Sequence, residues 1–220
     1  MRRASPGRRE LLRGVYFVTE EYGPGHLELC RRALEGGVRI VQFRDKTMSK
    51  DVFVDVGRKM REICAAYGAL LIVNDRVEEA VAIGADGVHV GQDDMPIRDA
   101  RALLGDEAIV GLSIASVEQA RAGELAGADY VAVSPVFDTA TKEDAGAGLG
   151  VGLVRDVRQA VGIPVAAIGG LNATNLSAVV EAGADMVAVV SAISRAHDPG
   201  AAARALVAAF EEAWKARNRR

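Results

Sequence analysis

Polar side chains alternate with other residues in the stretch VQFRDK at positions 41–46. In a β-strand, Gln42, Arg44 and Lys46 would share one face. The residues just before them, GVRIV, are apolar enough for burial, so this face would point into the protein. An unpaired guanidinium there would be costly, and we therefore expect Arg44 and Lys46 to bind an anion. A solvated lysine or a salt bridge to Asp45 is the alternative interpretation.

Acidic residues follow two later apolar stretches: Asp75 comes after LLIVN, and Asp94 comes after GVHVGQD. Either could cap a helix, because Asp75 with Glu78 forms a D-x-x-E variant of the capping box and Asp94 precedes Pro96. If the two stretches are neighbouring strands, however, the carboxylates lie at adjacent points of one rim. Such a pair beside a polyphosphate is a usual site for Mg²⁺. We therefore predict Asp75 and Asp94 as metal ligands and Mg²⁺ as the cofactor.

The elements that would position these residues are marked by a repeated phrase. It reads IGADGVHV, AGADYVAV and AGADMVAV, each time with a glycine suited to end a helix, then Ala-Asp, then an apolar strand. Helix-like runs at 49–66, 117–126, 174–182 and 201–216 lie between or after the apolar stretches. The strand candidates are YFVT, RIVQF, LLIVN, GVHVG, IVGLS, YVAVS, VAAIG and MVAVV.

About eight such units predict an α/β fold, a single-domain (β/α)8 TIM barrel over residues 1–220, with 1–13 as a basic lead-in. An open doubly wound sheet is the alternative, and closure is favoured because eight short strands leave no obvious edge. In a barrel of this kind, the active-site residues lie at the carboxyl ends of the strands. There, Gly169 and Gly170 follow strand seven and Ser191 follows strand eight, which is the usual phosphate-binding position of the fold. A glycine pair alone more often marks a turn.

Composition agrees with one globular domain, since 220 residues that are 50% apolar can bury a full core. The formal net charge of −3 excludes the basic stripe that nucleic acid requires. The cysteines Cys30 and Cys64 form no CxxC motif, and no run of ~18 apolar residues suggests a membrane span. The basic start lacks the apolar core of a signal peptide. We expect a cytoplasmic protein with small-molecule partners, and a homo-oligomer remains open.

The segment DTATKEDAGAGLGVG at 138–152 is rich in glycine and follows a strand candidate. Its glycines lack the G-x-G-x-x-G spacing of a nucleotide fingerprint. We predict a lid that closes over the site and carries Lys142, with a merely disordered loop as the alternative.

Together these motifs resemble the thiamine phosphate synthase family, from about Tyr16 to Ile193. The resemblance implies that Gln42, Arg44 and Lys46 bind the diphosphate of hydroxymethylpyrimidine diphosphate, and that Asp75 and Asp94 hold Mg²⁺. It further implies that Asn74 contacts substrate and that Ser113 and Lys142 contact the pyrimidine substrate. The residues implied to hold the thiazole phosphate are Thr139, Thr141, Gly170, Val190 and Ser191. Phe43 stands where the family usually has an aliphatic residue.

The implied reaction joins the pyrimidine to thiazole phosphate and releases diphosphate. No general base is needed, because the attacking ring nitrogen carries no proton; Arg44, Lys46, Lys142 and Ser113 would act by charge and alignment. The histidines are dispersed, and we interpret His89 as a packed structural residue. A thiazole tautomerase and a regulatory barrel that binds a phosphorylated metabolite are the alternatives, although neither would use the complete diphosphate set.

Overall fold

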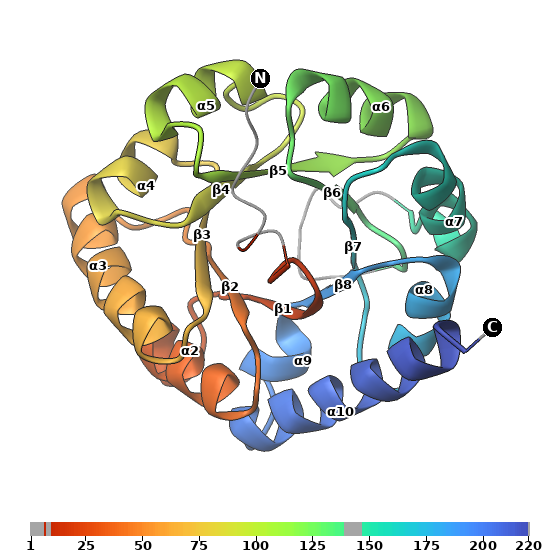
Figure 1. The fold of residues 1–220 in the computed structure, drawn as a ribbon. Coiled ribbons are helices and arrows are strands. Elements are labelled where there is room, and N and C mark those ends of the chain that lie inside the picture. Colours follow the sequence, from red (N-terminus) through yellow and green to blue (C-terminus); the bar gives the residue numbers. More distant parts are fainter. Residues whose placement is uncertain (1–6, 8–9, 139–146, 220) are drawn as a thin grey trace.

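The computed structural model describes residues 7, 10–138 and 147–219. Their eight parallel strands form a closed barrel, in which each strand pairs with the next and β8 pairs with β1. Figure 1 looks along the barrel and shows the helices as a ring around the strands. The predicted (β/α)8 barrel is confirmed, and the open sheet is wrong.

The elements alternate along the chain as expected. The strands are Gly14–Val18 (β1), Ile40–Phe43 (β2), Leu70–Asn74 (β3), Gly87–Val90 (β4), Ile109–Ile114 (β5), Tyr130–Val133 (β6), Val165–Ile168 (β7) and Met186–Val189 (β8). The helices are Gly25–Glu35 (α2), Lys50–Ala66 (α3), Val77–Ile83 (α4), Ile97–Leu104 (α5), Val117–Ala126 (α6), Gly150–Ala160 (α7), Leu176–Ala182 (α8), Ser191–Ser194 (α9) and Pro199–Arg217 (α10).

The strands separate two clusters of buried side chains. Outward-facing residues such as Val41 and Phe43 pack against the helices, whereas Ile40 and Tyr16 belong to the cluster inside the barrel. Side chains alternate along a strand, so Gln42 faces inward two residues after Ile40. It is 4% exposed, as the alternation in VQFRDK predicts.

The repeated Gly-Ala-Asp phrase forms the junction between a helix and an even-numbered strand. Its glycines adopt left-handed conformations that end α4, α6 and α8. Its aspartates each accept a backbone N–H from the preceding strand: Asp86 from Leu71, Asp129 from Val110 and Asp185 from Val165. Each also pairs with an arginine, namely Arg61, Arg101 and Arg158, respectively. The phrase therefore fixes three strand pairs at their amino ends.

Two segments differ from the simplest expectation. The last residues of the predicted lid, 150–152, belong to α7, because this helix begins at Gly150, where φ is +81°. At the start of the chain, Leu12 is 2% exposed and packs inside the barrel. The described end of the lead-in is thus part of the core.

Cys30 in α2 and Cys64 in α3 lie side by side although they are far apart in sequence. Both are buried free thiols, and their Sγ atoms are 3.8 Å apart. Within the described residues, no helix combines the length and apolarity that a membrane crossing requires.

Candidate active site

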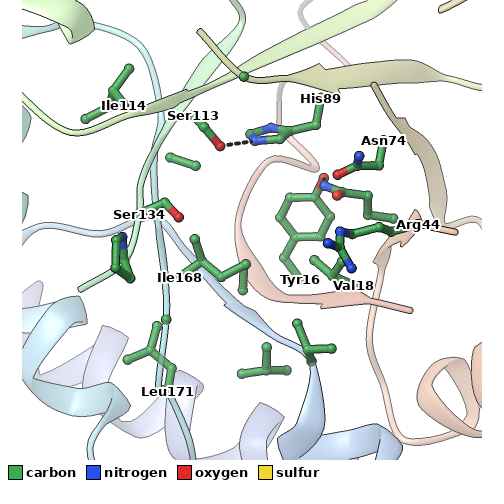
Figure 2. A pocket seen from close by; sticks show the side chains of 18 of the residues that line it. Tyr16, Val18, Arg44, Asn74, His89, Ser113, Ile114, Ser134, Ile168 and Leu171 are labelled. Atoms are coloured by element: carbon green, nitrogen blue, oxygen red, sulfur yellow. Dashed lines mark hydrogen bonds between the residues drawn. The ribbon is translucent and has the colours of Figure 1, made fainter. Parts of the chain in front are cut away.

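A cavity of about 660 Å³ opens at the carboxyl ends of the strands. Figure 2 shows Arg44, Asn74 and His89 on one side of it, and apolar side chains that include Ile168 and Leu171 on the other. Every predicted site residue in the described part of the chain lines this cavity: Gln42, Arg44, Lys46, Asn74, Asp75, Asp94, Ser113, Gly170, Val190 and Ser191. Thr139, Thr141 and Lys142, with most of the predicted lid, lie outside the described residues.

The cationic side of the cavity is formed where β2 ends. β2 stops at Phe43, but the alternation continues, so that Arg44 and Lys46 line the cavity while Asp45 between them is buried. Asp45 is hydrogen-bonded instead to the imidazole of His26, with 3.0 Å between Oδ2 and Nε2. Arg44 and Lys46 thus remain on the cavity side of the chain.

A buried network supports this loop from behind. Asp45 Oδ1 accepts hydrogen bonds from the backbone N–H groups of Thr47 and Met48, at 2.8 and 2.7 Å. His26 connects Asp45 to the hydroxyl of Thr19, at the end of β1. Burial alone would raise the pKa of Asp45, but the hydrogen bonds from the backbone of Met48 and Thr47, together with those from the side chains of His26 and Thr47, outweigh it and hold the pKa at about 2. The carboxylate therefore stays charged and fixes the turn that presents Arg44 and Lys46.

Asp75 and Asp94 approach each other across the ends of β3 and β4, as predicted. Burial raises the pKa of Asp75, and the neighbouring charge of Asp94 raises it further. Of the non-glycine residues that the structure describes, Asp75 alone has a left-handed backbone, with φ of 58°. Such strain is concentrated at functional sites.

The capping interpretation of these aspartates is wrong. Helix α4 has Arg76 at its N-cap and α5 has Pro96, and neither helix receives a side-chain cap. Asp94 Oδ2 instead accepts the backbone N–H of Gly91, at 2.7 Å. The carboxylates are thus directed to the rim of the cavity and not to helix termini.

The opposite end of the cavity is formed after β7 and β8. Gly169 and Gly170 have φ of 109° and 64°, which favour glycine. A Cβ on Gly170 would come within 2.8 Å of the carbonyl oxygen of Asp138. The glycine pair is therefore required where this loop packs against the segment 135–138 that follows β6, and it leaves backbone exposed beside Val190 and Ser191.

His89 has a role that the sequence interpretation missed. It is 8% exposed, so the predicted burial is confirmed. It also lines the cavity, and its Nε2 is hydrogen-bonded to Ser113 Oγ at 2.8 Å (Figure 2). Its other ring nitrogen lies 2.9 Å from the hydroxyl of Tyr130. The same alternation that found Gln42 would have found His89, because its strand neighbours Val88 and Val90 both face outward.

Comparison with known proteins agrees with this arrangement. The family model described as thiamine monophosphate synthase matches residues 15–193. The chain belongs to this family. A thiamine-phosphate synthase of Methanospirillum hungatei is 44% identical over 194 residues, 87% of this chain and 94% of that protein. One from Moorella thermoacetica is 46% identical over 191 residues, covering 86% and 91%.

A solved structure supports both fold and family. The thiamine phosphate pyrophosphorylase of Pyrococcus furiosus superposes with a TM-score of 0.87 at 37% identity, covering 94% of this chain and 98% of that one. A 3-hexulose-6-phosphate synthase, with a TM-score of 0.67 and 20% identity over 90% of this chain and 99% of its own, shares the fold alone. The chain is thus a thiamine monophosphate synthase family enzyme, a transferase of thiamine biosynthesis.

Proposed function

We propose that the chain joins hydroxymethylpyrimidine diphosphate to thiazole phosphate, which gives thiamine phosphate and diphosphate. The observation that carries this proposal is the two-ended cavity. One end combines Arg44 and Lys46 with two carboxylates, and the other combines exposed backbone at Gly170 with Ser191. A diphosphate and a monophosphate are the anions that these ends would suit.

The residues at the first end fit a magnesium ion. Burial raises the pKa of Asp75, and the nearby charge of Asp94 raises it further, which shows that the two carboxylates are close together. Hard carboxylate oxygens are the ligands that Mg²⁺ prefers. No group of three or more His, Cys, Asp or Glu side chains suited to a metal occurs among the described residues. Asp75 and Asp94 would therefore share the ion with water and substrate oxygens, as is usual for Mg²⁺ beside phosphates. When bound, it would neutralise part of the diphosphate charge.

The protein groups would act mainly by charge and position. Arg44 and Lys46 would hold the diphosphate and stabilise the negative charge that develops as its bond to the pyrimidine methylene breaks. The thiazole nitrogen would then attack the electron-deficient methylene through its lone pair, so no side chain has to remove a proton. Alignment of the two substrates in one cavity that excludes water would supply the rest.

The test is incubation of the purified protein with both substrates and Mg²⁺, followed by chromatography of thiamine phosphate and assay of diphosphate. We expect the two products in equal amounts, and neither when one substrate is omitted. Isomerisation of the thiazole phosphate alone would indicate a tautomerase. Tight binding of the phosphates without turnover would indicate a regulatory barrel, and either result would overturn the proposal.

A further inference from the structure

A row of hydrogen bonds crosses the barrel interior at the floor of the cavity. Gln42 Nε2 donates to the hydroxyl of Tyr16 at 2.6 Å, and this hydroxyl lies 2.9 Å from that of Tyr130. The Tyr130 hydroxyl is 2.9 Å from His89 Nδ1, and His89 Nε2 is 2.8 Å from Ser113 Oγ. Figure 2 shows the Ser113 end of the row beside His89 and Tyr16. The row connects Gln42 on β2 with Ser113 on β5, and both ends line the cavity.

Packing holds the central members of this row in place. The Tyr130 ring stacks on His89 with centroids 5.5 Å apart and meets Tyr16 edge to face at 6.1 Å. A Cβ on Gly111 would lie 2.1 Å from Cζ of Tyr130. Only glycine at position 111 therefore leaves room for the Tyr130 ring.

The hydrogens of the row can be assigned in sequence from the Gln42 end. An amide nitrogen can only donate, so Tyr16 accepts from Gln42 and has its own hydrogen left to donate to Tyr130. Tyr130 then donates to His89 Nδ1, which must be unprotonated. The ring hydrogen is consequently on Nε2 and is donated to Ser113 Oγ. In this direction each hydrogen finds an acceptor, and the hydroxyl hydrogen of Ser113 remains available to a ligand.

The opposite direction is less favourable. If His89 Nδ1 donated to Tyr130 and Tyr130 donated to Tyr16, the Tyr16 oxygen would accept twice. The Tyr16 hydrogen would then be left without a partner in this row, on a side chain that is only 2% exposed. A buried donor left unpaired costs about 1–3 kcal/mol. Burial also raises the pKa of both Tyr16 and Tyr130, so both phenols keep their hydrogens.

We propose that Tyr16, Tyr130 and His89 are positioning residues, which orient the row from Gln42 to Ser113 and make Ser113 a hydrogen-bond donor to the pyrimidine substrate. The identity of that ligand rests on the proposed function, whereas the direction of the row does not. Ser113 Oγ would accept from His89 Nε2, which leaves the hydroxyl hydrogen of Ser113 for the ligand. The cavity would therefore select a ring that places an acceptor atom at Ser113.

The direction of the row can be measured on the free enzyme. Long-range proton–nitrogen spectra of protein with ¹⁵N-labelled histidine distinguish the two tautomers, and His89→Gln and His197→Gln variants assign the signals. We expect His89 with its hydrogen on Nε2, and loss of this single tautomer in Tyr130→Phe. A hydrogen on Nδ1 in the wild-type protein would overturn the proposal, whether or not the enzyme uses the proposed substrates.

Kinetics test the link between Tyr130 and Ser113. Tyr130→Phe should lower kcat/KM for the pyrimidine diphosphate by about 10-fold, the scale of one hydrogen bond, and leave KM for thiazole phosphate unchanged. In a Ser113→Ala background the same change should cost less than about 2-fold, because residues that act through one contact are not additive. The control is Tyr67→Phe, at the outer end of α3. Equal losses from Tyr130→Phe in both backgrounds would show that Tyr130 has only a structural role.

Discussion

Asp75 has two properties at once, a left-handed backbone and a carboxylate that faces another carboxylate. Its neighbour Asn74 ends β3, so the strained residue is the first one of the loop. The left-handed backbone of Asp75 directs its side chain to the rim of the cavity. An ordinary capping geometry would have directed the side chain to the start of α4. The backbone and the charge of Asp75 thus serve the same site.

Asp75→Asn and Asp94→Asn should each raise the Mg²⁺ concentration required for half-maximal activity by at least about 10-fold, because each removes a charged oxygen ligand. The side-chain shape is kept, so the unfolding temperature should change little. Titration of activity with Mg²⁺, beside thermal unfolding, measures both quantities. Asp99→Asn, in the first turn of α5, is the matched control. Unchanged Mg²⁺ requirement in both site variants would contradict the metal assignment.

The two ends of the cavity should respond separately to substitution. Arg44→Ala removes charge-assisted hydrogen bonds and should raise KM for the pyrimidine diphosphate by about 10- to 100-fold. Ser191→Ala should instead raise KM for thiazole phosphate, by about 5-fold, as expected for one neutral hydrogen bond. Initial rates with each substrate varied in turn provide the measurement. Equal effects on both substrates in each variant would argue against two distinct anion sites.

At the scale of elements, the loop between β2 and α3 shows how much a two-residue period can predict. The alternation correctly placed Gln42, Arg44 and Lys46 on the cavity side, although β2 itself ends at Phe43. What it could not predict was the partner of Asp45, because His26 reaches it from another helix. Contacts between distant segments depend on packing that no local pattern contains. For the same reason, the bond between His89 and Ser113 escaped prediction although both strands were correctly placed.

Asp45→Asn should destabilise the fold at neutral pH by about 2–3 kcal/mol, the value of a carboxyl pKa lowered from 3.8 to about 2. Since the folded pKa is below the unfolded one, the charge stabilises the fold above about pH 4, and this contribution is lost as pH falls through 2. Urea unfolding between pH 7 and pH 2.5 should therefore show wild type and variant converging. Asp51→Asn, an exposed change in the first turn of α3, is the control. A difference that did not depend on pH would exclude the carboxylate charge as its cause.

For the whole molecule, closure of the barrel was predicted from the number and order of the strand candidates. The aspartates of the repeated phrase add hydrogen bonds that join neighbouring strands, together with ion pairs to arginines. Their strand candidates were visible in the sequence, but their arginine partners were not, because Arg101 in α5 and Arg158 in α7 lie 28 and 27 residues before the aspartates with which they pair. The three aspartates lie at the amino ends of β4, β6 and β8, whereas the cavity lies at the carboxyl ends. The ion pairs of the repeated phrase and the residues that line the cavity are thus separated along the strands.

Among these aspartates, Asp129 should contribute most to stability. Its side chain is fully buried and lies 2.6 Å from Arg101, which is 4% exposed. Asp129→Asn would leave a buried guanidinium without its charged partner, at a cost of about 3–5 kcal/mol. Asp185→Asn, in the same phrase, should cost less because Arg158 and Arg217 are partly exposed. Urea unfolding of both variants compares them, and equal losses would contradict the argument from burial.

The spacing of the aspartates also has a consequence for descent. They join β3 to β4, β5 to β6 and β7 to β8, so three successive pairs of βα units carry the same aspartate contact. In the remaining pair, β1 and β2, Arg39 occupies the corresponding position directly before β2. A barrel assembled by duplication of such a two-unit module would leave this trace. The loops that surround the cavity lie at the opposite ends of the strands, so a change in their sequence would leave the aspartate contacts of each module intact.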